Sequence, residues 1–137
     1  MRAAARTHRD LVAWKEAMSL LLEVYHIAAR LPTTERYGLS SQLRRAAVSV
    51  ATNIAEGFGR RSHADFARLL LIAEGSLREL QTLLEAVTLI GYLEESATQV
   101  ANEMSNRVGF LTQRLRGSLS QLPNRRAPRA PRAPRAP

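Results

Sequence analysis

The fold is decided by residues 62–91, which read SHADFARLLLIAEGSLRELQTLLEAVTLIG. Ser62 can cap the first turn of a helix, with the acidic Asp65 three positions on, and Gly91 suits the backbone conformation that ends one. Between them, apolar residues recur every three or four positions, which is the period of an α-helix. One stripe comprises Phe66, Leu70, Ala73, Leu77, Leu80, Leu84 and Val87. The segment therefore predicts one long amphipathic helix over residues 63–90.

A second stripe with helical spacing runs along the same segment: Leu69, Ile72, Ser76, Leu83 and Ile90. A helix on the surface of a monomer needs only one apolar face. We therefore expect this helix to be central in a bundle or to line a subunit interface. Leu69, Ile72 and Leu83 are the interface candidates.

Three further amphipathic helices are expected, over residues 8–31, 34–56 and 94–122. The first should begin at a capping box of Thr7 and Asp10 and bury Leu11, Trp14, Met18, Leu21, Leu22, Tyr25 and Ala28. The second should bury Leu39, Leu43, Ala46 or Ala47, Val50 and Ile54 and end at the left-handed glycine of a Gly-rich loop. The last should bury Ala97, Met104, Val108, Leu111, Leu115, Leu119 and Leu122. Short loops between long helices favour antiparallel neighbours, so residues 1–122 predict an all-α, up-down-up-down four-helix bundle.

Small residues in the middle of the second helix should allow a neighbouring helix to approach closely. We expect Gly75 of the third helix to pack against them. Asn53 lies one position off the buried stripe, and a polar group at a helical interface can fix the register of the helices. A ligand-binding role for Asn53 is the alternative, but no pocket signature surrounds it.

The formal net charge of +8 is concentrated in the last residues of the sequence. Residues 123–137 contribute +5 of it and alternate arginine with proline and alanine: Arg125, Arg126, Arg129, Arg132 and Arg135. Recurring proline prevents a helix and leaves little apolar surface to bury. We expect a disordered, extended cationic arm that suits an anionic polymer. The alternative is a solubilising extension without a role of its own.

A second group of arginines surrounds the expected loop between the second and third helices: Arg44, Arg45, Arg60, Arg61 and Arg68. Arginine binds phosphate through its planar fork, and a helix N-terminus such as the one at Ser62 attracts anions. The group therefore predicts a phosphate-binding patch. The alternative interpretation is that Arg44 or Arg45 pairs with Glu56 or another carboxylate inside the bundle or between subunits, and that the glycines of the loop form only a turn.

The sequence gives little support for chemistry or for a bound cofactor. It contains no cysteine, and His8, His26 and His63 are far apart. One Glu-x-x-His pair, Glu23 with His26, lacks the second pair that a di-iron bundle needs. We therefore expect a non-enzyme without metal or cofactor. No apolar run of roughly 18 residues is present, and no secretory signal is recognisable, so the expected location is the cytoplasm and not a membrane.

Several separated motifs agree in type and spacing with one known family. They are DLVAWK at residues 10–15, ERYGL at 35–39, QLRRAAVSV at 42–50, NIAEG at 53–57, GSLREL at 75–80 and GYL at 91–93. Over roughly residues 9–120 the chain resembles the four-helix-bundle proteins encoded in 23S rRNA intervening sequences. The resemblance implies an antiparallel bundle that assembles as a ring, typically a homopentamer, with no enzymatic activity.

The chain is also similar to the accessory variability proteins of diversity-generating retroelements. That similarity implies a basic barrel that binds nucleic acid and partners a reverse transcriptase. Two functions follow as hypotheses. The first is a homo-oligomeric accessory protein that binds RNA or DNA non-specifically through arginines. The second is a scaffold for a protein such as a reverse transcriptase, without direct contact to nucleic acid.

Overall fold

The computed structural model describes residues 4–120, and these form an all-α fold. The order of elements is the 3-10 turn η1 (His8–Asp10), α1 (Val12–Ala29), the 3-10 turn η2 (Thr33–Glu35), α2 (Leu39–Phe58), α3 (His63–Ile90) and α4 (Glu95–Leu119). The prediction of an all-α fold with four helices is confirmed. Leu122 and the five arginines of residues 123–137 lie outside the described residues.

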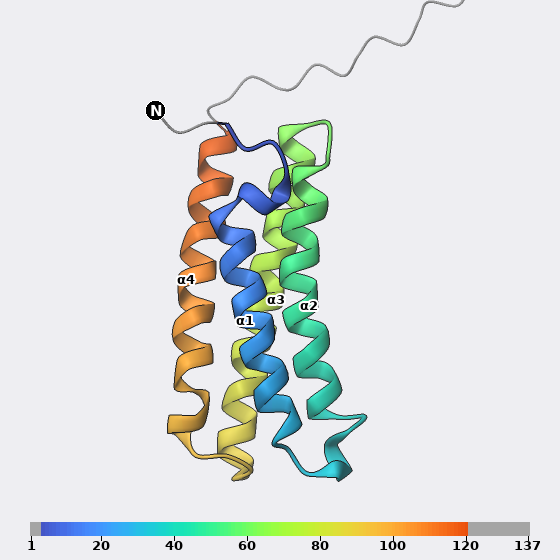
Figure 1. Cartoon of the computed structure of the whole chain (residues 1–137), viewed down its shortest axis with the longest axis vertical. Helices are drawn as coiled ribbons and strands as arrows, with labels where there is room; N and C mark the ends of the chain where they lie inside the picture. Colours follow the sequence, from blue (N-terminus) through green and yellow to red (C-terminus); the bar gives the residue numbers. More distant parts are fainter. Residues whose placement is uncertain (1–3, 121–137) are drawn as a thin grey trace, which may run out of the picture.

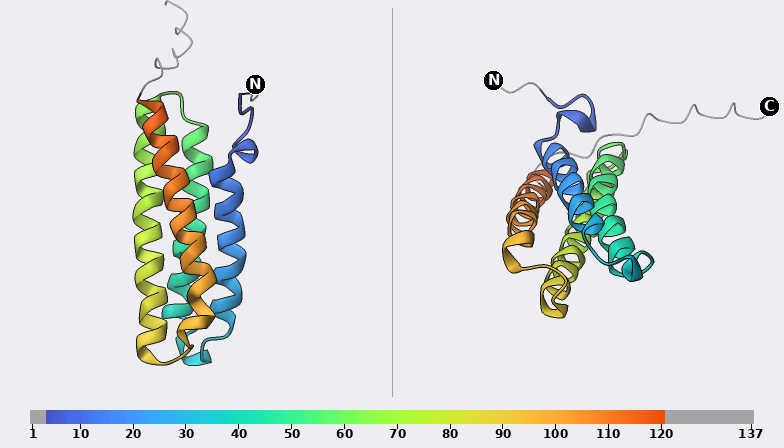
Figure 2. Two further views of the ribbon diagram at one scale, coloured as in Figure 1. Left: turned by 90° about the vertical axis from the view of Figure 1, so that its left-hand side faces the viewer. Right: turned by 60° about the horizontal axis from the view of Figure 1, so that its bottom comes forward.

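The four helices lie side by side in one elongated body (Figure 1). Consecutive helices run in opposite directions, because each loop returns the chain along the helix it has just left (Figure 1). Helices α1 and α3 each pack against α2 and α4, so α1 and α3 lie across the core from one another. The two views of Figure 2 show the same arrangement from the side and from one end.

Helix α3 follows its prediction closely. It spans His63–Ile90, the Ser62 hydroxyl accepts the Asp65 amide at 3.0 Å, and Gly91 has a φ of +92°. A positive φ is strained for residues with a Cβ, which is why glycine ends this helix. All seven residues of its first predicted stripe are buried in the core.

The second stripe of α3 is divided between the core and the surface. Leu69, Ser76 and Leu83 are buried within the protomer, whereas Ile72 and Ile90 are exposed. Leu69 and Leu83 thus agree with the first of the two predicted alternatives, a central position in the bundle, because both are buried within the protomer and Leu69 lies against Gly57 of α2. Ile72 remains accessible.

The close approach of α2 and α3 depends on a different glycine from the predicted one. A Cβ on Gly57 would lie 2.7 Å from Cδ2 of Phe66 and 3.3 Å from Cβ of Leu69. Gly57 is buried in the last turn of α2, where only a hydrogen fits. Gly75 is exposed, and a Cβ there would meet no atom within 4 Å, so its predicted packing against α2 is wrong.

Helices α1 and α4 follow their predicted faces only in part. Ala28, Val108 and Leu119 are buried as predicted, and other predicted residues pack half-buried against the core: Leu11, Trp14, Met18, Leu21, Met104, Leu111 and Leu115. The buried residues of α1 are Ala13, Ala17, Leu20, Val24, Ile27 and Ala28, while Leu22 and Tyr25 are exposed. Those of α4 are Thr98, Ala101, Ser105, Val108, Thr112 and Leu119, with hydroxyl groups bonded to carbonyls of their own helix. In α1 a stripe of small residues competed with one of large residues and was overlooked. In α4 the hydroxyls of the buried serine and threonine residues donate to carbonyls of their own helix. These residues can therefore be buried, although they look polar in the sequence.

Three predicted helix boundaries also need correction. Asp10 accepts backbone N–H groups of Arg6 and Thr7 and closes a 3-10 turn, and Leu11 is extended, so α1 begins only at Val12. Glu35 caps α2 by accepting the Leu39 amide at 2.8 Å, so the helix begins after Gly38 and not at residue 34. At its other end α2 continues to Phe58, and Gly59 has an ordinary right-handed conformation instead of the predicted left-handed one.

Candidate functional site

The predicted phosphate-binding patch is divided by the fold. Arg44 and Arg45 lie near the start of α2, about 16 residues and therefore roughly 24 Å along the helix axis from Arg60 and Arg61. They also diverge from each other, because successive helical residues point about 100° apart. Arg44 lies over the ring of Tyr25 from α1, at 5.6 Å, whereas Arg45 lines a hollow with Glu79 of α3. The structure does not bring these two arginines to the loop.

The alternative interpretation of the same arginines is not observed within the described part of one protomer, and pairing between subunits stays a prediction. Glu56 pairs with Arg60 one helical turn later, and not with Arg44 or Arg45. Within residues 4–120, neither Arg44 nor Arg45 forms an ion pair. Their positive charges therefore face solvent without a carboxylate partner.

A different set of arginines gathers at one end of the bundle. The N-terminal segment, the turn between α2 and α3 and the end of α4 all lie there (Figure 1), and a single cavity is lined by residues from all three. We call this region the basic end, and it carries Arg6, Arg9, Arg60, Arg61, Arg68 and Arg114. Arg6, Arg9 and Arg114 were not predicted, because only the topology brings their segments together.

Ion pairs neutralise part of the basic end. Arg60 pairs with Glu56, and the Arg68 Nε lies 3.7 Å from Oδ1 of Asp65. Both pairs are exposed, and exposed pairs of this kind exchange readily with other anions. Arg61 is exposed and has no ion pair among the described residues. It is therefore a cation that a phosphate can approach without displacing a carboxylate.

The carboxylate of Asp10 fixes the backbone at the basic end and forms no ion pair with an arginine in the described part of the chain. One oxygen, Oδ2, accepts the Arg6 amide at 2.9 Å and the Thr7 amide at 3.1 Å. These bonds lower the pKa of Asp10, with the Thr7 bond as the largest cause and the Arg6 bond next. The carboxylate thus remains ionised and fixes the turn that presents Arg6 and Arg9.

The opposite end of the bundle has more carboxylates. Glu94 and Glu95 are exposed at the start of α4, and Glu35 accepts the Tyr92 hydroxyl at 3.1 Å. Arg30 and Arg36 lie in the adjoining segments. Of the two ends of the bundle, the basic end therefore carries more arginines in the described part of the chain.

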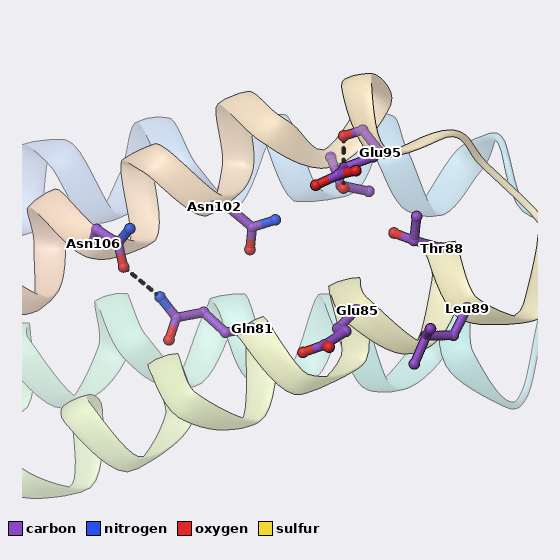
Figure 3. Close-up of a pocket in the computed structure, with 8 residues that line it drawn as sticks. Gln81, Glu85, Thr88, Leu89, Glu95, Asn102 and Asn106 are labelled. Carbon is purple, nitrogen blue, oxygen red and sulfur yellow. Dashed lines mark hydrogen bonds between the residues drawn. The ribbon is translucent and has the colours of Figure 1, made fainter.

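The groove between α3 and α4 is polar and lies on the side of the bundle (Figure 3). Its larger cavity, of about 570 Å³, is lined by amide and carboxylate side chains that include Glu85, Glu95 and Asn102. Gln81 Nε2 donates to Oδ1 of Asn106 across it at 2.9 Å (Figure 3). With two carboxylates and no arginine on its walls, this larger cavity does not suit a phosphate.

Polar contacts also hold α3 to both of its neighbours, α2 and α4. Of the residues that form these contacts, only Asn53 was predicted from the sequence. Asn53 donates to the carbonyl and hydroxyl of Ser49, which in turn lies 2.7 Å from the hydroxyl of Ser76. On the other side Arg116 forms two hydrogen bonds with the buried Glu74, at 2.8 and 3.1 Å, and the pKa of Arg116 is raised chiefly by them. Glu74, an acidic residue next to the apolar stripe of α3, was the feature of the sequence that could have predicted this ion pair.

Two properties of the described residues bear on other kinds of site. Residues 4–120 contain no group of three or more histidine, aspartate or glutamate side chains placed to hold a metal ion. None of the four helices has the length and apolar character to cross a membrane.

The comparisons with known proteins agree with this architecture. The chain is similar to a protein of unknown function from the S23 ribosomal protein family of Bacteroides thetaiotaomicron VPI-5482, solved as a crystal structure. The TM-score is 0.72 and the identity 22%, with 77% of this chain and 98% of the other covered. At that identity the likeness shows the fold alone. Among curated proteins, none matches the chain. The model of the 23S rRNA-intervening sequence proteins matches residues 9–114, and the chain belongs to that family.

Proposed function

We propose that this protein is a non-catalytic, homo-oligomeric accessory factor that binds RNA or DNA through the arginines of its basic end. The observation that carries the proposal is the gathering of six arginines from three separate segments at one end of the bundle. The first turn of α3 lies in the same region, and its free N–H groups add to the attraction for phosphate. Contacts of this kind recognise the backbone, so the binding is independent of base sequence.

Salt dependence is the direct test of this proposal. The full chain should bind a structured RNA, and log Kd should rise linearly with log salt concentration, because each neutralised phosphate contributes a slope of about 0.7 to 0.9. A variant that ends at residue 122 should bind more weakly and with a smaller slope if the arginines at 125, 126, 129, 132 and 135 contribute. Binding that is absent or insensitive to salt would contradict the proposal.

A matched pair of variants locates the binding surface. Arg61→Gln and Arg45→Gln each remove one exposed charge that has no ion pair in the described part of the chain. We expect the first to weaken binding several-fold and to lower the salt slope by about 0.7 to 0.9, and the second to change neither. Equal effects of the two variants would mean that the binding follows overall charge and not the basic end.

We also propose that the protomers assemble into a ring through the outer face shared by α1 and α2. Trp14, Met18, Leu21 and Tyr25 have a helical spacing that places them on one line, and Tyr25 of this line contacts Arg44 of α2. The neighbouring Leu22 has 60% of its surface exposed. Trp14, Met18 and Leu21 are half-buried against the core, while Leu22 and Tyr25 are exposed beside them. Exposed apolar side chains next to half-buried ones are typical of a protein interface. Five subunits are suggested by the family resemblance only.

Light scattering of the full chain tests the assembly. We expect a mass several times that of one protomer, and Leu22→Glu should reduce it towards the protomer mass, since a charge would be buried at the interface. Glu103, exposed on α4, provides the control Glu103→Gln, which should leave the mass unchanged. A protomer mass for the unaltered chain at high micromolar concentration would contradict the ring.

The second candidate function is a scaffold for another protein, such as a reverse transcriptase. It is favoured by apolar side chains that are exposed away from the α1/α2 face, among them Leu71, Leu89 and Phe110. A scaffold of this kind would bind its partner through apolar contacts, so the affinity would change little with salt. The same salt titration therefore separates the two functions.

A further inference from the structure

The basic end contains a cavity with apolar walls. It has a volume of about 200 Å³, and its walls include Leu11, Phe58, Phe66 and Leu115. The rings of Phe58 and Phe66 meet edge to face, with their centroids 6.2 Å apart. The cavity therefore differs from the polar groove between α3 and α4, because it offers aromatic surface to a ligand.

The cavity also has a polar rim that is incompletely used. Nδ1 of His63 is buried without a hydrogen-bond partner among the described residues. The hydroxyl oxygen of Ser62 accepts the Asp65 amide, which leaves its own hydrogen free to donate. Buried polar atoms are nearly always hydrogen-bonded in folded proteins, so the unpaired nitrogen of a residue that lines the cavity is a group that a hydrogen-bonding ligand would satisfy.

Positive charge adjoins the same cavity. Arg60 lines it, and the exposed Arg61 follows in the sequence. An apolar cavity with two hydrogen-bonding groups and flanking arginines matches the chemistry of a nucleotide, whose base is flat and edged with donors and acceptors and whose phosphate is anionic.

We propose that this cavity binds one unstacked nucleobase from a loop or an end of the bound nucleic acid, with Arg60 and Arg61 on the adjoining phosphates. The inference rests on the proposed function and adds to it a preference for unpaired bases. A volume of about 200 Å³ corresponds to roughly six or seven water molecules at about 30 Å³ each, which suits one heterocyclic ring system and not a base pair. Single-stranded RNA is commonly recognised by bases that stack on aromatic side chains.

The experiment compares two RNAs with equal numbers of phosphates, a hairpin with an unpaired loop and a blunt duplex, bound to the full chain and measured by fluorescence anisotropy. We expect the hairpin to bind about tenfold more tightly, as one stacked base can contribute. His63→Ala should abolish this difference, so that the variant binds the hairpin no more tightly than the duplex. His26→Ala is the matched control, because this histidine is exposed near the far end of α1.

Two further measurements keep the test decisive if His63→Ala alters the start of α3. Ser118→Phe narrows the cavity from α4 and should also remove the hairpin preference. Adenosine and uridine monophosphates, added without RNA, should shift the NMR resonances of the His63 ring, whereas hexanol should not compete with them.

The outcomes separate this inference from the proposed function. If both RNAs bind equally and His63→Ala behaves as His26→Ala does, the base-binding cavity is wrong while nucleic-acid binding stands. If neither RNA binds and the monophosphates leave His63 unchanged, both ideas fail. Displacement of the monophosphates by hexanol would show an apolar small-molecule cavity and would overturn the inference.

Discussion

Helix α3 is packed differently on its two sides. Towards α2 the contact is close, because Gly57 presents no side chain to Phe66 and the hydroxyls of Ser49 and Ser76 are within 2.7 Å. Towards α4 the helices leave cavities of about 570 and 240 Å³, compared with one of about 330 Å³ on the α2 side. Long polar side chains bridge that side, with Glu74 bonded to Arg116 and Gln81 to Asn106. One helix thus has a tight apolar neighbour and a loose polar one.

The difference shows where the stability of the bundle resides. On the α2 side small residues allow many van der Waals contacts, each weak but numerous. On the α4 side a few directed contacts replace them, and the only buried charge among the described residues, on Glu74, is held by one partner. We therefore expect substitutions on the two sides to lower the free energy of unfolding by different amounts. We also expect them to differ in whether a second substitution restores the lost stability.

The largest effect should come from Arg116→Leu. It leaves Glu74, with 4% of its side chain exposed, without the guanidinium that satisfies both carboxylate oxygens. Removing one partner of a buried pair costs about 3 kcal/mol or more. Urea unfolding followed by circular dichroism should show a loss of that size.

The double variant Glu74→Met with Arg116→Leu is the control for this prediction. Replacing both charges by apolar groups of similar size is often neutral, so most of the lost stability should return. A loss below about 0.5 kcal/mol for the single variant would mean that water satisfies Glu74 and that the pair behaves as a surface pair.

Gly57→Ala tests the tight side. The new Cβ would lie 2.7 Å from the Phe66 ring, which is itself part of the core. Overpacking costs about 1 to 3 kcal/mol, and alanine returns up to about 1 kcal/mol in helix propensity. A net loss of about 1 to 2 kcal/mol in the free energy of unfolding is therefore expected. A gain in stability would show that Phe66 moves freely and that the α2–α3 contact is not tight.

The asymmetry also explains how much of the fold the sequence could predict. The α3 helix was predicted correctly in its bounds and its first stripe, because its buried residues are large and regularly spaced. The buried face of α4 was predicted only in part, since Thr98, Ser105 and Thr112 hide their hydroxyls in their own helix and look polar in a sequence. A pattern of apolar residues identifies a helix that fills the core, but it misses one that meets the core with small polar residues.

The candidate site was predicted only in part, for a different physical reason. Arg60, Arg61 and Arg68 lie together because they are close in sequence, and they were predicted as a group. Arg44 and Arg45 were grouped with them by proximity in sequence, although a rigid helix of about 1.5 Å per residue separates them. The arginines that do join the basic end come from segments far apart in the chain, and their meeting depends on the packing of all four helices.

Gly75→Ala should stabilise the protein and is the matched partner of Gly57→Ala. Gly75 lies in the middle of α3 with its Cβ direction open to solvent. Alanine in an exposed helix interior is favoured over glycine by about 0.5 to 1 kcal/mol. The same substitution should thus have opposite signs at two glycines of adjacent helices. A destabilising Gly75→Ala, with the oligomer also weakened, would place this position at a subunit contact instead.

The smallest effect should come from the exposed polar link between the α3–α4 turn and the start of α2. The Tyr92 hydroxyl donates to Glu35, and this hydrogen bond is the main cause that raises the pKa of Tyr92. A raised pKa in the folded state stabilises the protein below the unfolded value of about 10, and that contribution is lost as the pH rises through the folded pKa. Because water competes for these exposed groups, the loss should be smaller than the gain at Gly75→Ala. Urea midpoints measured at pH 8 and above about pH 10 should fall with pH in the unaltered chain, and part of that fall should disappear in Tyr92→Phe. An identical fall in both proteins would show that the link contributes nothing and that directed polar contacts matter in this bundle only where they are buried.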